Sequence, residues 1–244
     1  IQYGPMSLIV LDPSDGQPHQ SVRDPNWRLR GENDGGHAPD WNPGSLQYNW
    51  LEQQLRLARD TSAFTFVMFH AAPYTSGVHG QPPGEADDED ILSSVPLKSL
   101  TPLFMKYGVD AVFSGHDEMY EHSLVTGQSL TGAGREVEHQ IHFFDVGIGG
   151  DGLRGPTPGV HNPEQVFLAH TDSPEHWDED GVLLDGGKHY GHLEVNIARM
   201  ENGHWKAHFD PVYVFPLIGE GSQIMGFERR VYADSFSLES GNLE

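Results

Sequence analysis

Histidine is the residue type that most clearly suggests chemistry in this sequence. The chain has 15 histidines against 14 lysines and arginines together. His70 directly follows the largely apolar segment 64–69, and Gly115-His116-Asp117-Glu118 follows the segment 109–114, whose polar residues are Asp110 and Ser114. Neutral imidazole suits zinc, iron, manganese or cobalt, and the two carboxylates would add hard oxygen ligands. The pattern predicts a metal site, with a structural histidine at a strand end as the alternative.

These residues can meet only if the elements before them lie side by side. Strand-sized apolar segments occur at residues 6–11, 64–69, 109–114 and 141–146. Helical spacing of apolar residues occurs at 45–59 and 97–107. This alternation predicts an α/β fold, and ligand sites of open α/β sheets form beyond the carboxyl ends of the strands. After about residue 155 the pattern changes, and antiparallel strands are expected at 193–198, 205–209 and 212–215.

Composition excludes several classes of function. The 244 residues include no cysteine and carry a formal net charge of -22. Disulfides, thiolate nucleophiles and cysteine-bound metals are therefore excluded, and nucleic acid is disfavoured as a partner because it requires basic surfaces. The apolar runs are too short for a membrane span. A small phosphate ester held by metal ions stays compatible with the charge, since bound cations reverse the local field.

Four segments carry a resemblance to a known family. They are Gln47-Tyr-Asn-Trp-Leu-Glu52, His70-Ala-Ala-Pro-Tyr74 with His79, the segment 106–123, and Val146-Gly-Ile-Gly-Gly-Asp-Gly-Leu-Arg154. In this order they resemble the calcineurin-like metallophosphoesterases, nearest to the purple acid phosphatases. The resemblance runs from about residue 4 to residue 215. It implies an α/β sandwich of two mixed β-sheets flanked by helices.

The resemblance also implies an activity. A binuclear centre of divalent or trivalent ions (iron, zinc or manganese) would hydrolyse a small phosphate mono- or diester. His70 and His116 match ligands of one ion, and Glu118 stands where the family has a histidine ligand of the other. His79 matches a histidine that hydrogen-bonds the phosphate or protonates the leaving group.

Two tyrosines and three missing motifs complete the comparison with the family. Tyr74 and Tyr120 match positions that line or buttress the site and are expected to help bind the substrate. The family motifs Asp-x-His, Gly-Asp-x-x-Asp and Gly-Asn-His-Glu/Asp do not occur in this sequence. We therefore expect residues 1–215 to be the C-terminal part of a domain, with long loops at 17–44 and 155–188 and a C-terminal extension at 216–244. An upstream segment of the same protein or a companion fragment would complete the site.

Other interpretations stay open at this point. Glu118 and the missing motifs also suit a catalytically inactive phosphoesterase-like domain with a structural or binding role, for example in an extracellular assembly. The acidic residues 85–90 suit a solvated loop, and calcium is the alternative because it prefers clustered carboxylates. A periplasmic or extracellular location is expected, because the branch that the chain resembles is often exported.

Overall fold

The structure is a computed structural model that describes residues 1–13, 41–83, 93–150, 152–169, 176–179, 183–185, 187–219, 221 and 223–240. The acidic run 85–90 and most of the expected loop 17–44 lie outside this part of the chain. The helices and strands, in chain order, are β1 (Gln2–Tyr3), β2 (Met6–Val10), α1 (Leu46–Thr61), β3 (Phe64–Met68), η2 (Val78–Gly80), η3 (Val95–Leu100), α2 (Thr101–Lys106), β4 (Ala111–Ser114), β5 (Tyr120–Leu130), β6 (Glu136–Val146), η4 (Gly147–Gly149), β7 (Gln165–Leu168), β8 (His176–Trp177), β9 (Leu183–Asp185), β10 (Gly191–Arg199), β11 (Trp205–Ile218), β12 (Ile224–Val231) and β13 (Phe236–Glu239).

The expected α/β class with two sheets is confirmed. The first sheet has seven strands in the order β1-β2-β3-β4-β6-β5-β7, and the second has four, with β11 between β10 on one side and β12 and β13 on the other. In the first sheet, β2, β3, β4 and β6 run parallel, while β1, β5 and β7 pair antiparallel. The second sheet is antiparallel throughout, not mixed as expected. Only short stretches of sequence separate β10 from β11 and β11 from β12, and connections this short require antiparallel strands.

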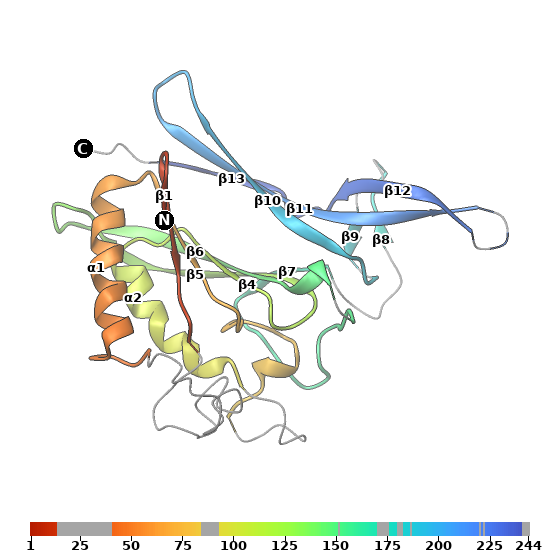
Figure 1. Cartoon of the computed structure of the whole chain (residues 1–244), viewed down its shortest axis with the longest axis horizontal. Coiled ribbons are helices and arrows are strands. Elements are labelled where there is room, and N and C mark those ends of the chain that lie inside the picture. Colours follow the sequence, from red (N-terminus) through yellow and green to blue (C-terminus); the bar gives the residue numbers. More distant parts are fainter. Residues whose placement is uncertain are drawn as a thin grey trace.

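The core lies on both faces of the seven-stranded sheet. Side chains alternate along β3, so Phe64 and Phe66 point to one face and Val67 to the other, and all three are buried. Helices α1 and α2 cover the face of Val67, where Leu55 of α1 is fully buried. The four-stranded sheet covers the opposite face with residues such as Phe209. Figure 1 shows this order of layers, with the helices on the side away from β10–β13.

Helix α1 begins and packs as its sequence predicts. The hydroxyl of Ser45 accepts a hydrogen bond from the backbone N–H of Tyr48 at 3.1 Å, which satisfies one of the free donors at the helix start. Leu51, Leu55 and Ala58 form the buried stripe of the helix. Among the described residues, no helix is both long enough and apolar enough to cross a membrane.

Two expected elements differ in extent. The helix expected at 97–107 is a 3₁₀ segment, η3, followed by α2, and each has a proline in its first turn. The strands expected at 205–209 and 212–215 are one strand, β11. Pro211 lies within β11, where its carbonyl accepts a hydrogen bond from the N–H of Tyr232. Tyr232 stands in the gap between the end of β12 and the start of β13. On that side of β11 no ladder hydrogen bond from the Pro211 nitrogen is needed.

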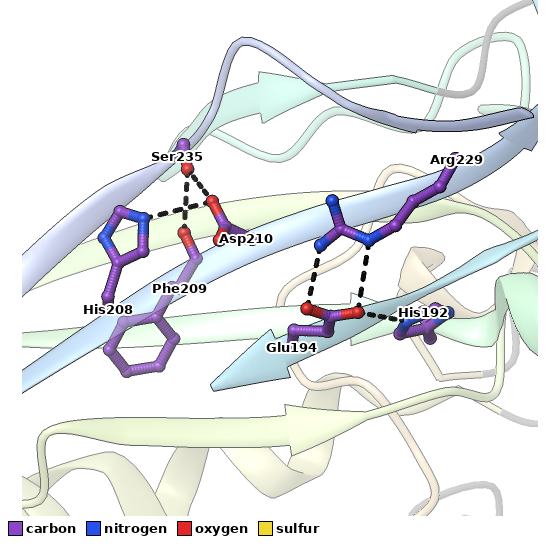
Figure 2. Close-up of polar contacts among 7 residues, drawn as sticks. All are labelled: His192, Glu194, His208, Phe209, Asp210, Arg229 and Ser235. Carbon is purple, nitrogen blue, oxygen red and sulfur yellow. Dashed lines mark hydrogen bonds and ion pairs between the residues drawn. The ribbon is translucent and has the colours of Figure 1, made fainter. Parts of the chain in front are cut away.

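Ion pairs and hydrogen bonds connect the strands of the second sheet. Arg229 of β12 reaches Glu194 of β10 at 2.8 Å, and His192 lies 3.1 Å from the same carboxylate (Figure 2). In the turn before β13, the Ser235 hydroxyl donates to the backbone carbonyl of Phe209 at 3.2 Å. The ion pair is exposed, so it contributes little to stability. Residues 216–244, expected as an extension, contribute β12 and β13 to this sheet.

Candidate functional site

His70 and His116 lie together at the carboxyl ends of two neighbouring parallel strands. β3 pairs with β4, and the pairing continues beyond the strand ends through the hydrogen bond from Gly115 N–H to the carbonyl of His70, at 3.0 Å. This register brings Nδ1 of His116 to 2.9 Å from Nε2 of His70. Two strands therefore deliver two imidazoles to one point on the sheet edge, where α/β sheets form ligand sites.

His79 joins the pair from the short helix η2. Its ring packs against that of His116 in a tilted arrangement, with the ring centroids 3.7 Å apart and an interplanar angle of 36°. The three histidines and Glu118 line one pocket of about 710 Å³. The rest of its lining comes from the loops after β4 and β6: Gly115, Val146, Gly147, Gly149, Gly150 and Arg154. Four of the sequence-predicted site residues thus face the same space.

The two strand-end imidazoles favour their neutral form. Burial lowers the pKa of His116 to about 3, and the charges of His79, His70 and Arg154 act in the same direction. Burial also lowers the pKa of His70, with a further contribution from His79. A neutral imidazole keeps the lone pair that a metal ion needs. At neutral pH both side chains are therefore in the form that binds metal.

Asp117 holds the loop that carries His79. Its side chain is 2% exposed and does not line the pocket. Its carboxylate accepts hydrogen bonds from the Thr75 hydroxyl at 2.8 Å and from the His79 backbone N–H at 3.4 Å. Gly77 allows the approach, since a Cβ at that position would lie 2.3 Å from Cγ of Asp117. Asp117 was expected as an oxygen ligand beside His116, but it points into the protein and fixes the loop.

Glycine is also required where the segment after β6 packs against Asp117. A Cβ added to Gly147 would lie 2.1 Å from the backbone oxygen of Asp117. A residue without a side chain permits this close backbone approach, and Gly147 supplies it. The glycine lets the loop after β6 pack directly against the loop after β4, so both line the pocket.

Glu118 faces an arginine. Its Oε2 lies 2.8 Å from Nε of Arg154, although the atoms lack the alignment of a hydrogen bond. The backbone N–H of Arg154 donates to the backbone carbonyl of Glu118 at 2.9 Å. The carboxylate expected to bind the second metal ion is therefore engaged by a cation. Arg154 was not singled out as a site residue from the sequence, although it ends one of the segments that resemble the family.

Neither tyrosine expected to bind substrate lines the pocket. Tyr74 is buried in the core under the helices, and its hydroxyl lies 3.0 Å from the Thr101 hydroxyl. Tyr120 is fully buried between the two sheets and donates a hydrogen bond to Asp234 at 2.7 Å. In the sequence, Tyr74 lies between the pocket residues His70 and His79, and Tyr120 follows the pocket residue Glu118 closely. Their placement suits support of the site and gives no support to contact with a substrate.

Two more carboxyl groups are buried behind the pocket. Glu121 accepts hydrogen bonds from the Ser76 backbone at 2.7 Å and from Asn162 at 2.6 Å. Asp145 is 1% exposed, and no hydrogen bond of normal geometry reaches either of its oxygens, although the Gly147 amide favours its charged form. Burial, with the charges of Asp117 and Glu121 next, raises the pKa of Asp145 well above its usual range. Asp145 is thus held in its protonated form more readily than an ordinary aspartate.

The fit of this site to metal is partial. The nitrogens of His70 and His116 are 2.9 Å apart, at hydrogen-bonding distance. Two nitrogens bound to one ion at about 2.0–2.1 Å lie about 3.3 Å apart in a tetrahedral site and about 2.9 Å apart where their bonds meet at a right angle. Within the described ranges, no group of three or more His, Asp or Glu side chains is arranged to hold a metal ion. The described part of the chain brings two potential nitrogen ligands together and does not form a complete centre.

Comparison with known proteins gives the relationship. No family model matches the sequence. The chain is 39% identical over 175 residues to a probable purple acid phosphatase 20 of Arabidopsis thaliana, covering 71% of this chain and 34% of that protein. It is 24% identical over 174 residues to purple acid phosphatase 18 of the same plant, covering 71% and 33%. The solved structure of purple acid phosphatase PPD1 from yellow lupin (Lupinus luteus) seeds aligns at 17% identity and a TM-score of 0.43, over 79% of this chain and 29% of that one.

The chain therefore shows partial homology to purple acid phosphatases. The aligned region covers most of this sequence, and it spans about a third of the length of the curated relatives. The resemblance identified from the four sequence segments is confirmed at this level.

Proposed function

Because the chain is homologous over 71% of its length to purple acid phosphatases, we propose that it belongs to a metal-dependent phosphoesterase. In this proposal the whole protein hydrolyses phosphate mono- or diesters at a binuclear centre. This chain contributes His70 and His116 to one ion, and an upstream segment or companion fragment contributes the rest. The observation that carries the proposal is the 2.9 Å approach of two neutral imidazoles at the ends of β3 and β4.

The chain's own residues have defined parts in this chemistry. Bound iron, zinc or manganese ions would polarise a phosphoryl oxygen and supply an activated nucleophile. His79 lines the same pocket and packs against His116, and its ring can hydrogen-bond a phosphoryl oxygen or donate a proton to the leaving group. Asp117 keeps His79 in place through the loop. Glu118 is paired with Arg154, so the proposal rests on the two histidines as ligands.

The proposal is tested with the full-length gene product. We expect hydrolysis of p-nitrophenyl phosphate or bis(p-nitrophenyl) phosphate in the presence of Mn²⁺, Zn²⁺ or iron. His116→Ala should abolish turnover, and His79→Gln should lower kcat more than it raises KM. The exposed Arg135, which lies outside the pocket, supplies the control Arg135→Ala with unchanged turnover. Absence of turnover with every metal by a folded, metal-loaded protein would refute the enzymatic function.

A second function is favoured by one feature of the pocket. The pairing of Glu118 with Arg154 removes a potential metal ligand. This pairing suits an inactive phosphoesterase-like domain with a structural or binding role, for example in an extracellular assembly. The sequence encoded before Ile1 separates the two functions, because intact Asp-x-His and Gly-Asn-His motifs there favour the enzyme. Under either function we propose a periplasmic or extracellular location.

A further inference from the structure

We propose that Arg154 is the anion-binding residue of the pocket and that Glu118 holds its guanidinium in place. The ligand class is the tetrahedral phosphate dianion, either free phosphate or the phosphoryl group of a monoester. The choice of ligand rests on the proposed function, whereas the assignment of Arg154 rests on the pocket itself.

Two contacts fix Arg154 at the pocket wall. Its backbone N–H donates to the carbonyl of Glu118, and its Nε lies 2.8 Å from the Glu118 carboxylate. The residue follows the turn at η4, whose glycines line the pocket together with it. The main chain and the side chain are therefore both anchored to the loop that carries His116. An arginine held in this way loses less conformational freedom when it binds a ligand.

The terminal nitrogens of Arg154 contact no other charged or polar side chain among the residues that the structure describes. The ion pair of its guanidinium is the one from Nε to Glu118. The side chain is 57% exposed, while that of Glu118 is 16% exposed. A guanidinium presents its donors as a planar fork, which matches two oxygens of a phosphate. With Nε against the carboxylate, the terminal nitrogens of this pocket-lining residue remain as donors.

The positive charge of Arg154 offsets the repulsion between the acidic protein and an anionic ligand in the pocket. The protein carries a net charge of -22, which repels an approaching dianion. Among the pocket-lining residues Glu118 is acidic, and Arg154 is the one with a permanent positive charge.

Binding of inorganic phosphate and phenyl phosphate to the 244-residue chain tests this inference. Titrations followed by calorimetry or ³¹P NMR are made with EDTA present, so that no metal contributes. Arg154→Ala should weaken the binding of both ligands at least tenfold, and Arg154→Lys should weaken it less because the charge is kept. Arg135→Ala removes the same charge outside the pocket and should change the Kd less than twofold. Tighter binding of inorganic phosphate would identify free phosphate as the ligand, and tighter binding of phenyl phosphate would identify the phosphoryl group of a monoester.

Two results would overturn the inference. One is phosphate binding by Arg154→Ala that equals binding by the control. The other is no detectable binding by the wild-type chain at about 10 mM ligand, a level that corresponds to a binding free energy of only about 3 kcal/mol. Arg154→Gln serves as a second variant, and thermal unfolding confirms that each variant is folded. Because EDTA is present, loss of phosphate binding in Arg154→Ala stands even when the full-length protein proves inactive. If the full-length protein hydrolyses phosphate esters and Arg154→Ala binds phosphate as tightly as wild type, the role of Arg154 is refuted and the proposed function stands.

Discussion

The contact between Gly77 and Asp117 leads to a quantitative prediction about the loop that holds His79. In Gly77→Ala, the new Cβ would lie 2.3 Å from Cγ of Asp117 and 2.5 and 2.7 Å from its two oxygens. The backbone angles of Gly77, φ -75° and ψ -175°, suit alanine, so the effect comes from this contact and not from backbone strain. The carboxylate is 2% exposed and bound to Thr75, so it cannot swing into solvent.

The expected loss of stability follows from these contacts. Overpacking costs about 1–3 kcal/mol, loss of a hydrogen bond to a charged group costs about 1.5–3 kcal/mol, and the lower entropy of unfolded alanine returns about 0.4–1 kcal/mol. We expect Gly77→Ala to lower the free energy of unfolding by about 1.5–5.5 kcal/mol, as measured by urea denaturation with an unchanged m-value. Gly226→Ala is the matched control, because its Cβ meets nothing within 4 Å. Equal stability of the two variants would refute the role of Asp117 in fixing the loop.

Two further predictions concern buried groups that titrate. His142 is 7% exposed, and its burial lowers its pKa to about 3, with a smaller contribution from His122. The contribution of the neutral ring to stability is therefore present above about pH 6.5 and is lost as the pH falls. The difference in unfolding free energy between wild type and His142→Gln should therefore shrink by about 1 kcal/mol between about pH 7 and pH 5.5, and a constant difference would contradict this pKa. Asp145 has a raised pKa, so wild-type stability is lost as the pH rises through that value. Asp145→Asn should raise the melting temperature more at about pH 8 than at about pH 6, and a gain independent of pH would contradict the assignment.

The placement of His70 and His116 could be predicted because it depends on strand order alone. Each histidine follows a strand-sized apolar segment, and the carboxyl ends of neighbouring parallel strands meet at one edge. The apolar residues of β3 also predicted a strand covered on both faces, as the structure shows. Local signals therefore identified the elements that position the site.

The partners of Asp117 and Glu118 could not be predicted in the same way. Both residues stand beside His116 in the sequence and were expected to be ligands. Whether a carboxylate points into a pocket or into the core depends on residues from distant loops, here Thr75 for Asp117 and Arg154 for Glu118. No spacing in the sequence encodes these contacts. The continuity of β11 through Pro211 was missed for a similar reason, since it depends on where β12 and β13 end.

The metal content of the full-length gene product tests the central claim most directly. After loading with Zn²⁺ or Mn²⁺ and removal of excess metal, elemental analysis of the wild type should find bound metal. His116→Ala should lose at least one equivalent, whereas Glu118→Gln should keep the wild-type content because that carboxylate pairs with Arg154. Wild-type metal content in folded His116→Ala would contradict the assignment of the two strand-end histidines as metal ligands.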